Sequence, residues 1–253
     1  MIHIDPTLRS VVHRYPTEYQ PTSIASLGGA GGFSGARFWR LGTARGEFIL
    51  RQWPTEHPTP RRLSLVHAVL HHAASRGMRL LPVPVATRDG DSFVQHDNRL
   101  WELAPWLPGK ADYATAPSRN KLRAAMNALG QFHQATADFK VSVPSKKARC
   151  VSPGIVDRGR RLTDLSQGGL HLLRESIDDA INGRLVLPAR EFLAAADRGL
   201  ALASRQLRPL VDLQLHCQPV IRDIWREHVL FEGERVTGLV DFGAVQFDTP
   251  LLD

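Results

Sequence analysis

The fold of this chain is decided by the stretch IRDIWREHVLF, residues 221–231, together with the residues that follow it. Asp223 lies in the polar part of this stretch, and His228 follows it five positions later. Residues 229–242 contain two apolar runs around a glycine-bearing turn, a pattern that predicts a β-hairpin. The second strand of that hairpin would bring Asp241 back towards the loop that carries Asp223.

Acidic side chains that converge in this way suit phosphoryl transfer from ATP. That reaction needs a carboxylate that orients the incoming hydroxyl and accepts its proton, and it needs ligands that hold magnesium on the phosphates. Asp223 and Asp241 supply the carboxylates, and His228 is spaced as a possible further ligand. Simpler interpretations stay open here. An aspartate before a hairpin is often a turn or capping residue, and His228 could be a structural histidine that donates to a backbone carbonyl.

The same residues resemble a known family, the protein-kinase-like phosphotransferases, and specifically the aminoglycoside phosphotransferase and choline kinase group. The family loop reads approximately H-G-D-x-x-x-x-N-V-L-F and leads to a hairpin that ends in I-D-F or I-D-W; here the hairpin ends in LVDF, residues 239–242. The resemblance implies that Asp223 is the catalytic aspartate, that Asp241 is a magnesium ligand and that His228 replaces the family's metal-binding asparagine. It also implies ATP and Mg²⁺ as cofactors. Arg222 or Arg226 could neutralise the charge that develops in the reaction.

The N-terminal half supports the resemblance at three places. A glycine-rich segment, 28–35, lies where the family has the loop that covers the phosphates, and its backbone amides could bind phosphate oxygens. Arg51 lies on a predicted strand where the family has a phosphate-binding lysine or arginine, and residues 102–106 fall where the adenine-binding segment would lie. The nucleotide-binding residues implied in this way are Gly29, Gly31, Gly32, Ser34, Arg51, Glu102 and Ala104. A flexible hairpin connection and an exposed strand arginine remain the alternative interpretations of the glycines and of Arg51.

The chain departs from the family pattern at three positions. The loop begins with Ile221 and Arg222 in place of His-Gly, which removes the histidine that normally braces it. The nitrogen of His228 suits transition metals better than magnesium, which prefers oxygen ligands. The predicted helix 61–75 contains no acidic residue, so the family's ion pair between strand and helix is missing. These departures motivate the alternative of a catalytically inactive, nucleotide-binding or scaffold protein.

Two histidines of that predicted helix have a spacing of their own. His67 and His71 are four residues apart, which is compatible with zinc binding on one helix face. No third ligand is indicated, so we expect ordinary core or surface roles for both.

The elements along the chain predict an α+β protein with the two-lobed protein-kinase-like fold. Strands dominate the first part, a Pro/Gly-rich segment follows, and helical patterns dominate from Ser118 onward. The predicted strands are 22–27, 36–41, 47–53, 83–88, 92–96 and 100–104, and the predicted helices are 61–75, 118–133, 157–182 and 188–207. The expected domains are an antiparallel-sheet nucleotide-binding lobe at 1–104, a hinge at 105–109 and, at 110–253, a helical lobe with the catalytic loop and the metal-binding hairpin.

Composition narrows the classes of partner. The chain has 253 residues, 43% of them hydrophobic, which is enough to bury a core. Its formal charge of +7 favours an anionic partner, but the basic residues are scattered and no nucleic-acid-binding motif accompanies them. No signal peptide or uninterrupted apolar run of about 18 residues is visible, so we expect a cytoplasmic protein without membrane or nucleic-acid partners. The expected partner is a small molecule that offers a hydroxyl. Family members usually continue past the equivalent of Asp253, so we expect the C-terminal helices to be lacking.

Overall fold

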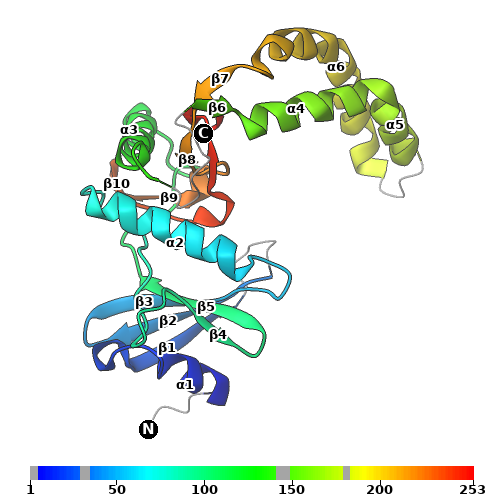
Figure 1. The fold of residues 1–253 in the computed structure, drawn as a ribbon. Helices are drawn as coiled ribbons and strands as arrows, with labels where there is room; N and C mark the ends of the chain where they lie inside the picture. The colour runs from blue at the N-terminus through cyan, green and yellow to red at the C-terminus, as the bar shows by residue number, and fades with distance from the viewer. Residues whose placement is uncertain (1–4, 29–34, 141–148, 179–182) are drawn as a thin grey trace. The chain divides into compact units, whose positions relative to one another are not determined.

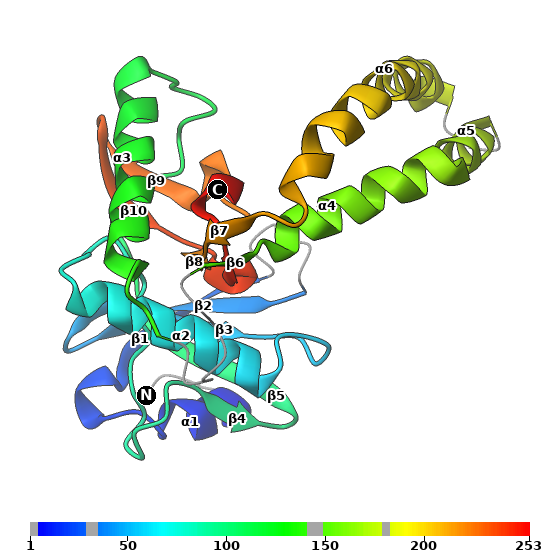
Figure 2. The same cartoon turned by 45° about the horizontal axis from the view of Figure 1, so that its top comes forward.

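The computed structural model describes residues 5–28, 35–140, 149–178 and 183–253 (Figures 1 and 2). The chain forms two compact units. The first comprises Met1–Phe139, Ile221–Gln246 and Asp253, and the second comprises Lys140–Val220 and Phe247–Leu252. The predicted hinge segment 105–109 and every described residue that the sequence singled out for chemistry lie in the first unit.

An antiparallel sheet of five strands forms the N-terminal part of the first unit, in the order β1-β2-β3-β5-β4 (Figure 1). Its strands are β1 (Pro21–Gly28), β2 (Arg37–Thr43), β3 (Gly46–Gln52), β4 (Val94–His96) and β5 (Arg99–Pro105). Helix α1 (Pro6–Val12) packs against one face, where Leu50 of β3 and Leu103 of β5 are completely buried. Because side chains alternate along a strand, their neighbours Arg51 and Glu102 belong to the opposite face.

The pairing of β3 with β5 decides which side chains meet on that opposite face. Arg51 lies opposite Glu102, and Ile49 lies opposite Ala104. Residues directly opposite each other in an antiparallel pair have Cβ atoms about 4.5–5.5 Å apart. The register of the sheet therefore places a guanidinium group beside a carboxylate.

Two helices and a hairpin complete the first unit. They are α2 (Pro60–Ser75), α3 (Arg119–Thr136), β9 (Val229–Glu232) and β10 (Arg235–Leu239), with β9 and β10 antiparallel as the sequence predicts. Thr59 caps α2 by accepting a hydrogen bond from a backbone N–H, and Ser118 caps α3 in the same way. Such caps satisfy backbone donors that have no partner inside the helix.

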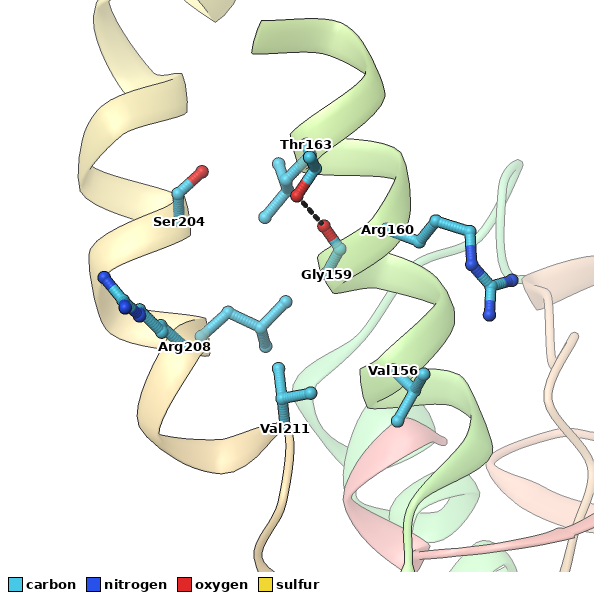
Figure 3. A pocket seen from close by; sticks show the side chains of 9 residues that line it. Val156, Gly159, Arg160, Thr163, Ser204, Arg208 and Val211 are labelled. Atoms are coloured by element: carbon cyan, nitrogen blue, oxygen red, sulfur yellow. Dashed lines mark hydrogen bonds between the residues drawn. The ribbon is translucent and has the colours of Figure 1, made fainter. Parts of the chain in front are cut away.

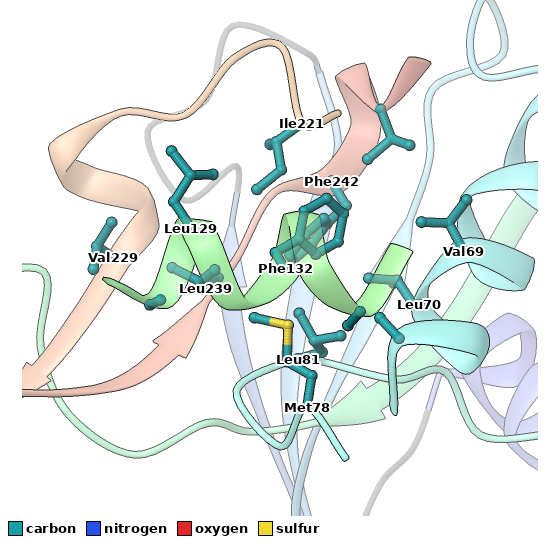
Figure 4. Packing of buried hydrophobic residues seen from close by; sticks show 14 of the residues in the cluster. Val69, Leu70, Met78, Leu81, Leu129, Phe132, Ile221, Val229, Leu239 and Phe242 are labelled. Carbon is teal, nitrogen blue, oxygen red and sulfur yellow. The ribbon is translucent and has the colours of Figure 1, made fainter. Parts of the chain in front are cut away.

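Apolar side chains of these elements share one core (Figure 4). The residues drawn include Val69, Leu70, Leu129, Phe132, Ile221, Leu239 and Phe242. Ile221 is completely buried and Phe242 nearly so. Packing therefore fixes both ends of the 221–242 region, at the residue before Arg222 and at the residue after Asp241.

The second unit is mainly helical. Its elements are β6 (Arg149–Val151), α4 (Pro153–Asp164), α5 (Leu170–Asp178), α6 (Gly183–Leu207), β7 (Gln214–His216), β8 (Gln218–Val220) and most of β11 (Gln246–Asp248). A cavity of about 520 Å³ lies between α4 and α6, lined by side chains that include Val156, Arg160 and Val211 (Figure 3). Helix α4 is capped by Ser152, a completely buried residue whose hydroxyl donates to the carboxylate of Asp248.

The predicted α+β class is confirmed, but two of the predicted elements differ. Residues 83–88 form no strand, since Pro82 and Pro84 interrupt the segment and a proline cannot donate to a sheet. The helix predicted over 157–182 is divided into α4 and α5 at Leu165–Gly169, where Gly168 has φ +118°. No helix in the described ranges is both long and apolar enough to span a membrane.

Candidate active site

The pair on β3 and β5 continues into a line of contacts through the first unit. Arg51 Nη1 lies 3.9 Å from Glu102 Oε1 and 3.7 Å from Asp241 Oδ1. Asp241 Oδ2 lies 3.7 Å from His228 Nε2, and His228 Nδ1 lies 2.9 Å from the backbone carbonyl oxygen of Asp223. Direct contacts therefore join Glu102, Arg51, Asp241, His228 and the Asp223 backbone, which the sequence had singled out separately.

Arg51 is held tightly, with its side chain 14% exposed. Its guanidinium carbon lies 3.3 Å from the centroid of the Trp53 ring and 5.2 Å from that of Phe38. Burial lowers the pKa of Arg51, and the carboxylates of Glu102 and Asp241 counteract part of that shift. Its Nε has no hydrogen-bond partner among the described residues. A planar guanidinium that stacks on an aromatic ring matches the geometry of phosphate oxygens.

Glu102 has a second partner on helix α2. His67 Nε2 lies 2.6 Å from Glu102 Oε2, and His67 Nδ1 lies 2.8 Å from Ser92 Oγ. Burial acts to raise the pKa of Glu102, but the hydrogen bond from His67 and the charges of His67 and Arg51 outweigh it, so the pKa lies below its ordinary value of 4.5. The Glu102 carboxylate is therefore ionised at neutral pH inside a largely buried site.

Asp241 and Asp223 are the exposed acidic groups of the site. The Asp241 backbone is left-handed, with φ 61°, a conformation that aspartate adopts more readily than most residues. Its side chain is 46% exposed. The Val240 N–H donates to the carbonyl of His228 over 2.9 Å, which ties the end of the hairpin to the loop. Asp223 is exposed, and its Oδ1 accepts a hydrogen bond from Trp225 Nε1.

The start of the loop is anchored by the carboxylate of Asp253. The backbone N–H groups of Ile221 and Arg222 donate to its two oxygens over 2.8 Å and 2.5 Å. His133 of α3 lies 2.9 Å from the same carboxylate, and the side chain of Asp253 is completely buried. Arg222 has φ 73°, a left-handed conformation that glycine adopts without strain. The family's glycine at this position thus has a conformational reason, which Arg222 meets under strain.

These contacts identify residues to which the sequence gave no role. His67 was expected to have an ordinary core or surface role, and Asp253 was noted only as the last residue of the sequence. A signal for His67 was present, because it shares the buried face of α2 with Leu63 and Leu70, and a buried imidazole needs polar partners. Asp253 gave no local signal, since its partners lie far away along the chain.

The remaining predicted site residues are Ala104 and four residues of the glycine-rich segment. Ala104 pairs with Ile49 at the end of β5. The glycine-rich segment residues Gly29, Gly31, Gly32 and Ser34 lie outside the described residues.

The donor set of the site can be tested for a metal ion. Among the described residues, no three His, Cys, Asp or Glu side chains gather closely enough to bind one by themselves. Magnesium, however, usually needs only one or two protein carboxylates, with phosphates and waters completing its shell, and the exposed carboxylate of Asp241 meets that need. Because His228 Nδ1 faces a carbonyl, it carries the proton when the ring is neutral, and the Nε2 lone pair then faces Asp241. A cation near these two atoms fits both.

Comparison with known proteins decides the family. The sequence pattern described as "Phosphotransferase enzyme family" matches residues 28–253, which is most of the chain. The chain belongs to the phosphotransferase enzyme family. This membership agrees with the resemblance carried by the 221–242 region.

The curated proteins to which the chain is similar include homoserine kinases. The protein from Pseudomonas aeruginosa is 27% identical over 164 residues, covering 64% of this chain and 43% of that protein. The protein from Rhizobium rhizogenes is 26% identical over 227 residues, covering 89% of this chain and 61% of that protein, and the one from Beijerinckia indica is 28% identical over 221 residues, covering 87% and 59%. The chain thus spans about half of the length of the curated relatives that it matches.

Solved structures of phosphotransferases and a kinase share the fold of this chain. An aminoglycoside phosphotransferase from Alicyclobacillus acidocaldarius aligns with a TM-score of 0.57 at 16% identity, covering all of this chain and 70% of that one. A spectinomycin phosphotransferase in complex with ADP and spectinomycin aligns at 0.60 with 13% identity, covering 92% and 67%. An amicoumacin kinase in complex with AMP-PNP and Ca²⁺ aligns at 0.60 with 13% identity, covering 96% and 65%. The predicted protein-kinase-like fold is therefore confirmed.

Proposed function

We propose that this chain carries the nucleotide-binding and catalytic site of an ATP-dependent kinase that phosphorylates a hydroxyl of a small molecule. The observation that carries the proposal is the unbroken line of contacts from Glu102 through Arg51, Asp241 and His228 to the Asp223 backbone. It brings a buried phosphate-binding cation within ion-pair distance of an exposed metal-binding carboxylate, and a histidine connects that carboxylate to the loop of the candidate base. Phosphoryl transfer requires these three parts together.

Each residue has a role in this proposal. Asp223 orients the acceptor hydroxyl and accepts its proton at the carboxylate, while Trp225 Nε1 holds one of its oxygens. Arg51 donates to phosphate oxygens, and Arg222 neutralises developing charge. Asp241 would hold the magnesium ion, with His228 as its neighbouring ligand. Magnesium, when bound, draws charge from the phosphate oxygens.

The nucleotide would also contact the N-terminal sheet. The backbone amides of Gly29, Gly31, Gly32 and Ser34 are proposed to surround the phosphates. The adenine would lie at the end of β5, where Ala104 pairs with Ile49. Glu102 is proposed to act on the nucleotide through Arg51, because its carboxylate oxygens face Arg51 and His67.

The acceptor is proposed to be a small polar alcohol that also carries an amine. The names of the relatives motivate this class, since they include homoserine kinases and phosphotransferases of aminoglycosides and spectinomycin. Homoserine is the first acceptor to test, followed by amino alcohols, aminoglycosides, sugars and nucleosides.

A second candidate is a nucleotide-binding protein without turnover. Two observations favour it: the Ile221-Arg222 start of the loop, and a histidine at 228 in place of the family's asparagine. Thermal denaturation with ATP separates the two candidates, because a ligand that binds the folded state raises Tm. If the chain is a kinase, we expect a larger rise in Tm with ATP and Mg²⁺ together than with ATP alone. If it is a nucleotide-binding protein without turnover, we expect no rise in Tm or a rise that does not depend on Mg²⁺.

The decisive experiment is an ADP-release screen over this acceptor panel, with Mg²⁺ and with Mn²⁺. We expect acceptor-dependent release of ADP from at least one member of the panel. Asp223→Asn should strongly reduce this release. Its matched control is Asp89→Asn, at an exposed aspartate that pairs with Arg14 on the surface, and this variant should leave ADP release unchanged. Absence of acceptor-dependent release from a chain whose Tm responds to ATP would favour the nucleotide-binding protein without turnover.

A further inference from the structure

Helix α2 lacks the acidic residue that would pair directly with the strand arginine. Between Arg61 and Arg76 the helix offers no carboxylate, yet Arg51 is buried, and a buried guanidinium needs a counter-ion. The structure supplies that counter-ion from β5, where Glu102 faces Arg51 across the sheet. The helix contributes His67 instead, which bonds the far oxygen of the same carboxylate.

The hydrogen bonds of His67 define its orientation. A carboxylate only accepts hydrogen bonds, so His67 Nε2 carries a proton and donates to Glu102 Oε2 over 2.6 Å. The other nitrogen, Nδ1, is held by the hydroxyl of Ser92 at 2.8 Å. The ring is 2% exposed, and its two nitrogens both have partners, so its position is fixed by hydrogen bonds at both ends. Glu102 thus has one oxygen bound by the helix and the other turned to Arg51.

We propose that His67 is a positioning residue, which through Glu102 holds the Arg51 guanidinium where it contacts the nucleotide phosphates. This inference rests on the proposed function, because it assumes that Arg51 binds phosphate. The connection between helix and strand then consists of three residues, His67, Glu102 and Arg51, in place of a direct ion pair. In this arrangement Glu102 positions the guanidinium of Arg51 and does not itself contact the nucleotide.

Helix α2 also contacts the other half of the site. Arg62 Nη2 donates to the backbone carbonyl of Gly243 over 3.2 Å, two residues after Asp241. One helix therefore holds the strand arginine through His67 and the metal-binding segment through Arg62. Movement of α2 would therefore displace both Arg51 and the segment after Asp241. Loss of the His67 contact alone should affect phosphate binding by Arg51, because the Arg62 contact remains.

The zinc-like spacing of His67 and His71 gives no competing role for His67. His71 is exposed, whereas His67 is buried, and the two nitrogens of His67 face Glu102 and Ser92. His71 is instead the matched control, since it is a histidine on the same helix, one turn away.

The test measures binding of AMP-PNP with Mg²⁺ by calorimetry, which needs no turnover. His67→Leu removes the donor to Glu102 and is expected to raise Kd about tenfold, the typical result of leaving a buried charged group without its partner. His67→Gln, whose amide can still donate, should lose less, and His71→Gln should stay within about twofold of wild type. The double variant His67→Glu/Glu102→Gln, which moves the carboxylate from strand to helix, should recover most of the affinity lost in His67→Leu.

Two results would overturn the inference. The first is a folded His67→Leu variant that binds AMP-PNP as tightly as wild type. A different outcome, a wild-type chain that binds no nucleotide, would contradict the proposed function on which the inference rests. If His67→Leu does not fold, ¹⁵N NMR of the wild-type histidines decides. We expect the His67 ring resonances to move when AMP-PNP binds and those of His71 to stay, and an unmoved His67 in a nucleotide-bound protein would contradict the inference.

Discussion

Each half of the site contains a carboxylate that is hydrogen-bonded to a histidine, but the two carboxylates contact different groups. In the sheet half, the carboxylate of Glu102 is bonded by His67 at 2.6 Å and faces a side chain, the guanidinium of Arg51. In the loop half, the carboxylate of Asp253 is bonded by His133 at 2.9 Å and accepts two backbone N–H groups. These two carboxylate–histidine pairs thus stand at two of the three departures from the family pattern, the helix without an acidic residue and the start of the loop.

The two carboxylate–histidine pairs differ in whether the carboxylate contacts backbone or a side chain, and this difference predicts different effects of mutation. A backbone loop needs its N–H groups satisfied, so the Asp253 pair contributes mainly to folding and loop shape. In the proposed function Arg51 is a phosphate-binding cation, which needs a fixed position, so we expect the Glu102 pair to contribute mainly to ligand affinity. Breaking the first pair should therefore cost stability, and breaking the second should cost binding.

The largest effect is expected for Asp253→Ala. The substitution removes a completely buried carboxylate that accepts from two backbone N–H groups and contacts His133, which costs about 2–4 kcal/mol of unfolding free energy. Denaturation by urea measures it. The matched control is Asp138→Ala, which breaks exposed pairs with His72, at the same 2.9 Å, and with Arg76 and should cost less than about 1 kcal/mol. Equal losses for the two variants would contradict the anchoring role of Asp253.

The next effect concerns Arg51→Lys. A lysine carries the charge but loses the flat group that stacks 3.3 Å from the Trp53 ring and contacts two carboxylates. We expect AMP-PNP to bind about tenfold more weakly, equal to about 1.4 kcal/mol, with unfolding free energy changed less than in Asp253→Ala. Arg40→Lys is the control, because Arg40 also stacks on a tryptophan, Trp106, and pairs with Glu47 at the surface; there, affinity should not change.

A smaller effect is expected on the acid limb of stability. The pKa of Glu102 is lowered in the folded state, so the unfolded chain binds the proton more readily and stability rises with pH. The contribution of Glu102 is therefore complete above its ordinary value of 4.5 and is lost as the pH falls through the folded pKa. Glu102→Gln should reduce the unfolding free energy at neutral pH and approach wild type as the pH falls below 4.5 and through the lowered pKa. A difference that is constant with pH would contradict the ionised state of the Glu102 carboxylate, which Arg51 and His67 contact.

The smallest effect is expected for Arg222→Gly. Relief of the left-handed backbone at φ 73° stabilises the loop, while the added freedom of glycine in the unfolded chain offsets part of this. We expect a net change of no more than about 1 kcal/mol, neutral or stabilising. Arg123→Gly, in the middle of α3, should instead destabilise by about 1 kcal/mol. A fall in turnover for Arg222→Gly at unchanged stability would assign the side chain a role in charge neutralisation.

The sequence predicted the parts of this site that depend on local patterns. The loop and hairpin of 221–242, the cap at Ser118 and the strand that carries Arg51 follow from spacing, turn residues and alternation. The contact of Asp241 with His228 also follows, because a hairpin returns its end to its beginning.

What the sequence could not predict depends on register and on distant contacts. Glu102 meets Arg51 only because β5 pairs with β3 in one register, and a shift by one residue would turn its carboxylate to the other face. His67 gains its role from a residue 35 positions away, and Asp253 from His133, 120 positions away. Such partners become visible only when the packing of α2 and α3 is known.

The most direct test of the account is single-turnover phosphoryl transfer by Asp223→Asn beside wild type, with the acceptor identified by the ADP-release screen. We expect the Kd of AMP-PNP to be unchanged, since Asp223 contacts the rest of the site through its backbone carbonyl. The rate of transfer should fall about 10²- to 10⁴-fold, as expected when a proton-accepting carboxylate is removed. Transfer at the wild-type rate by the folded, nucleotide-bound variant would contradict the central claim that this loop carries the chemistry.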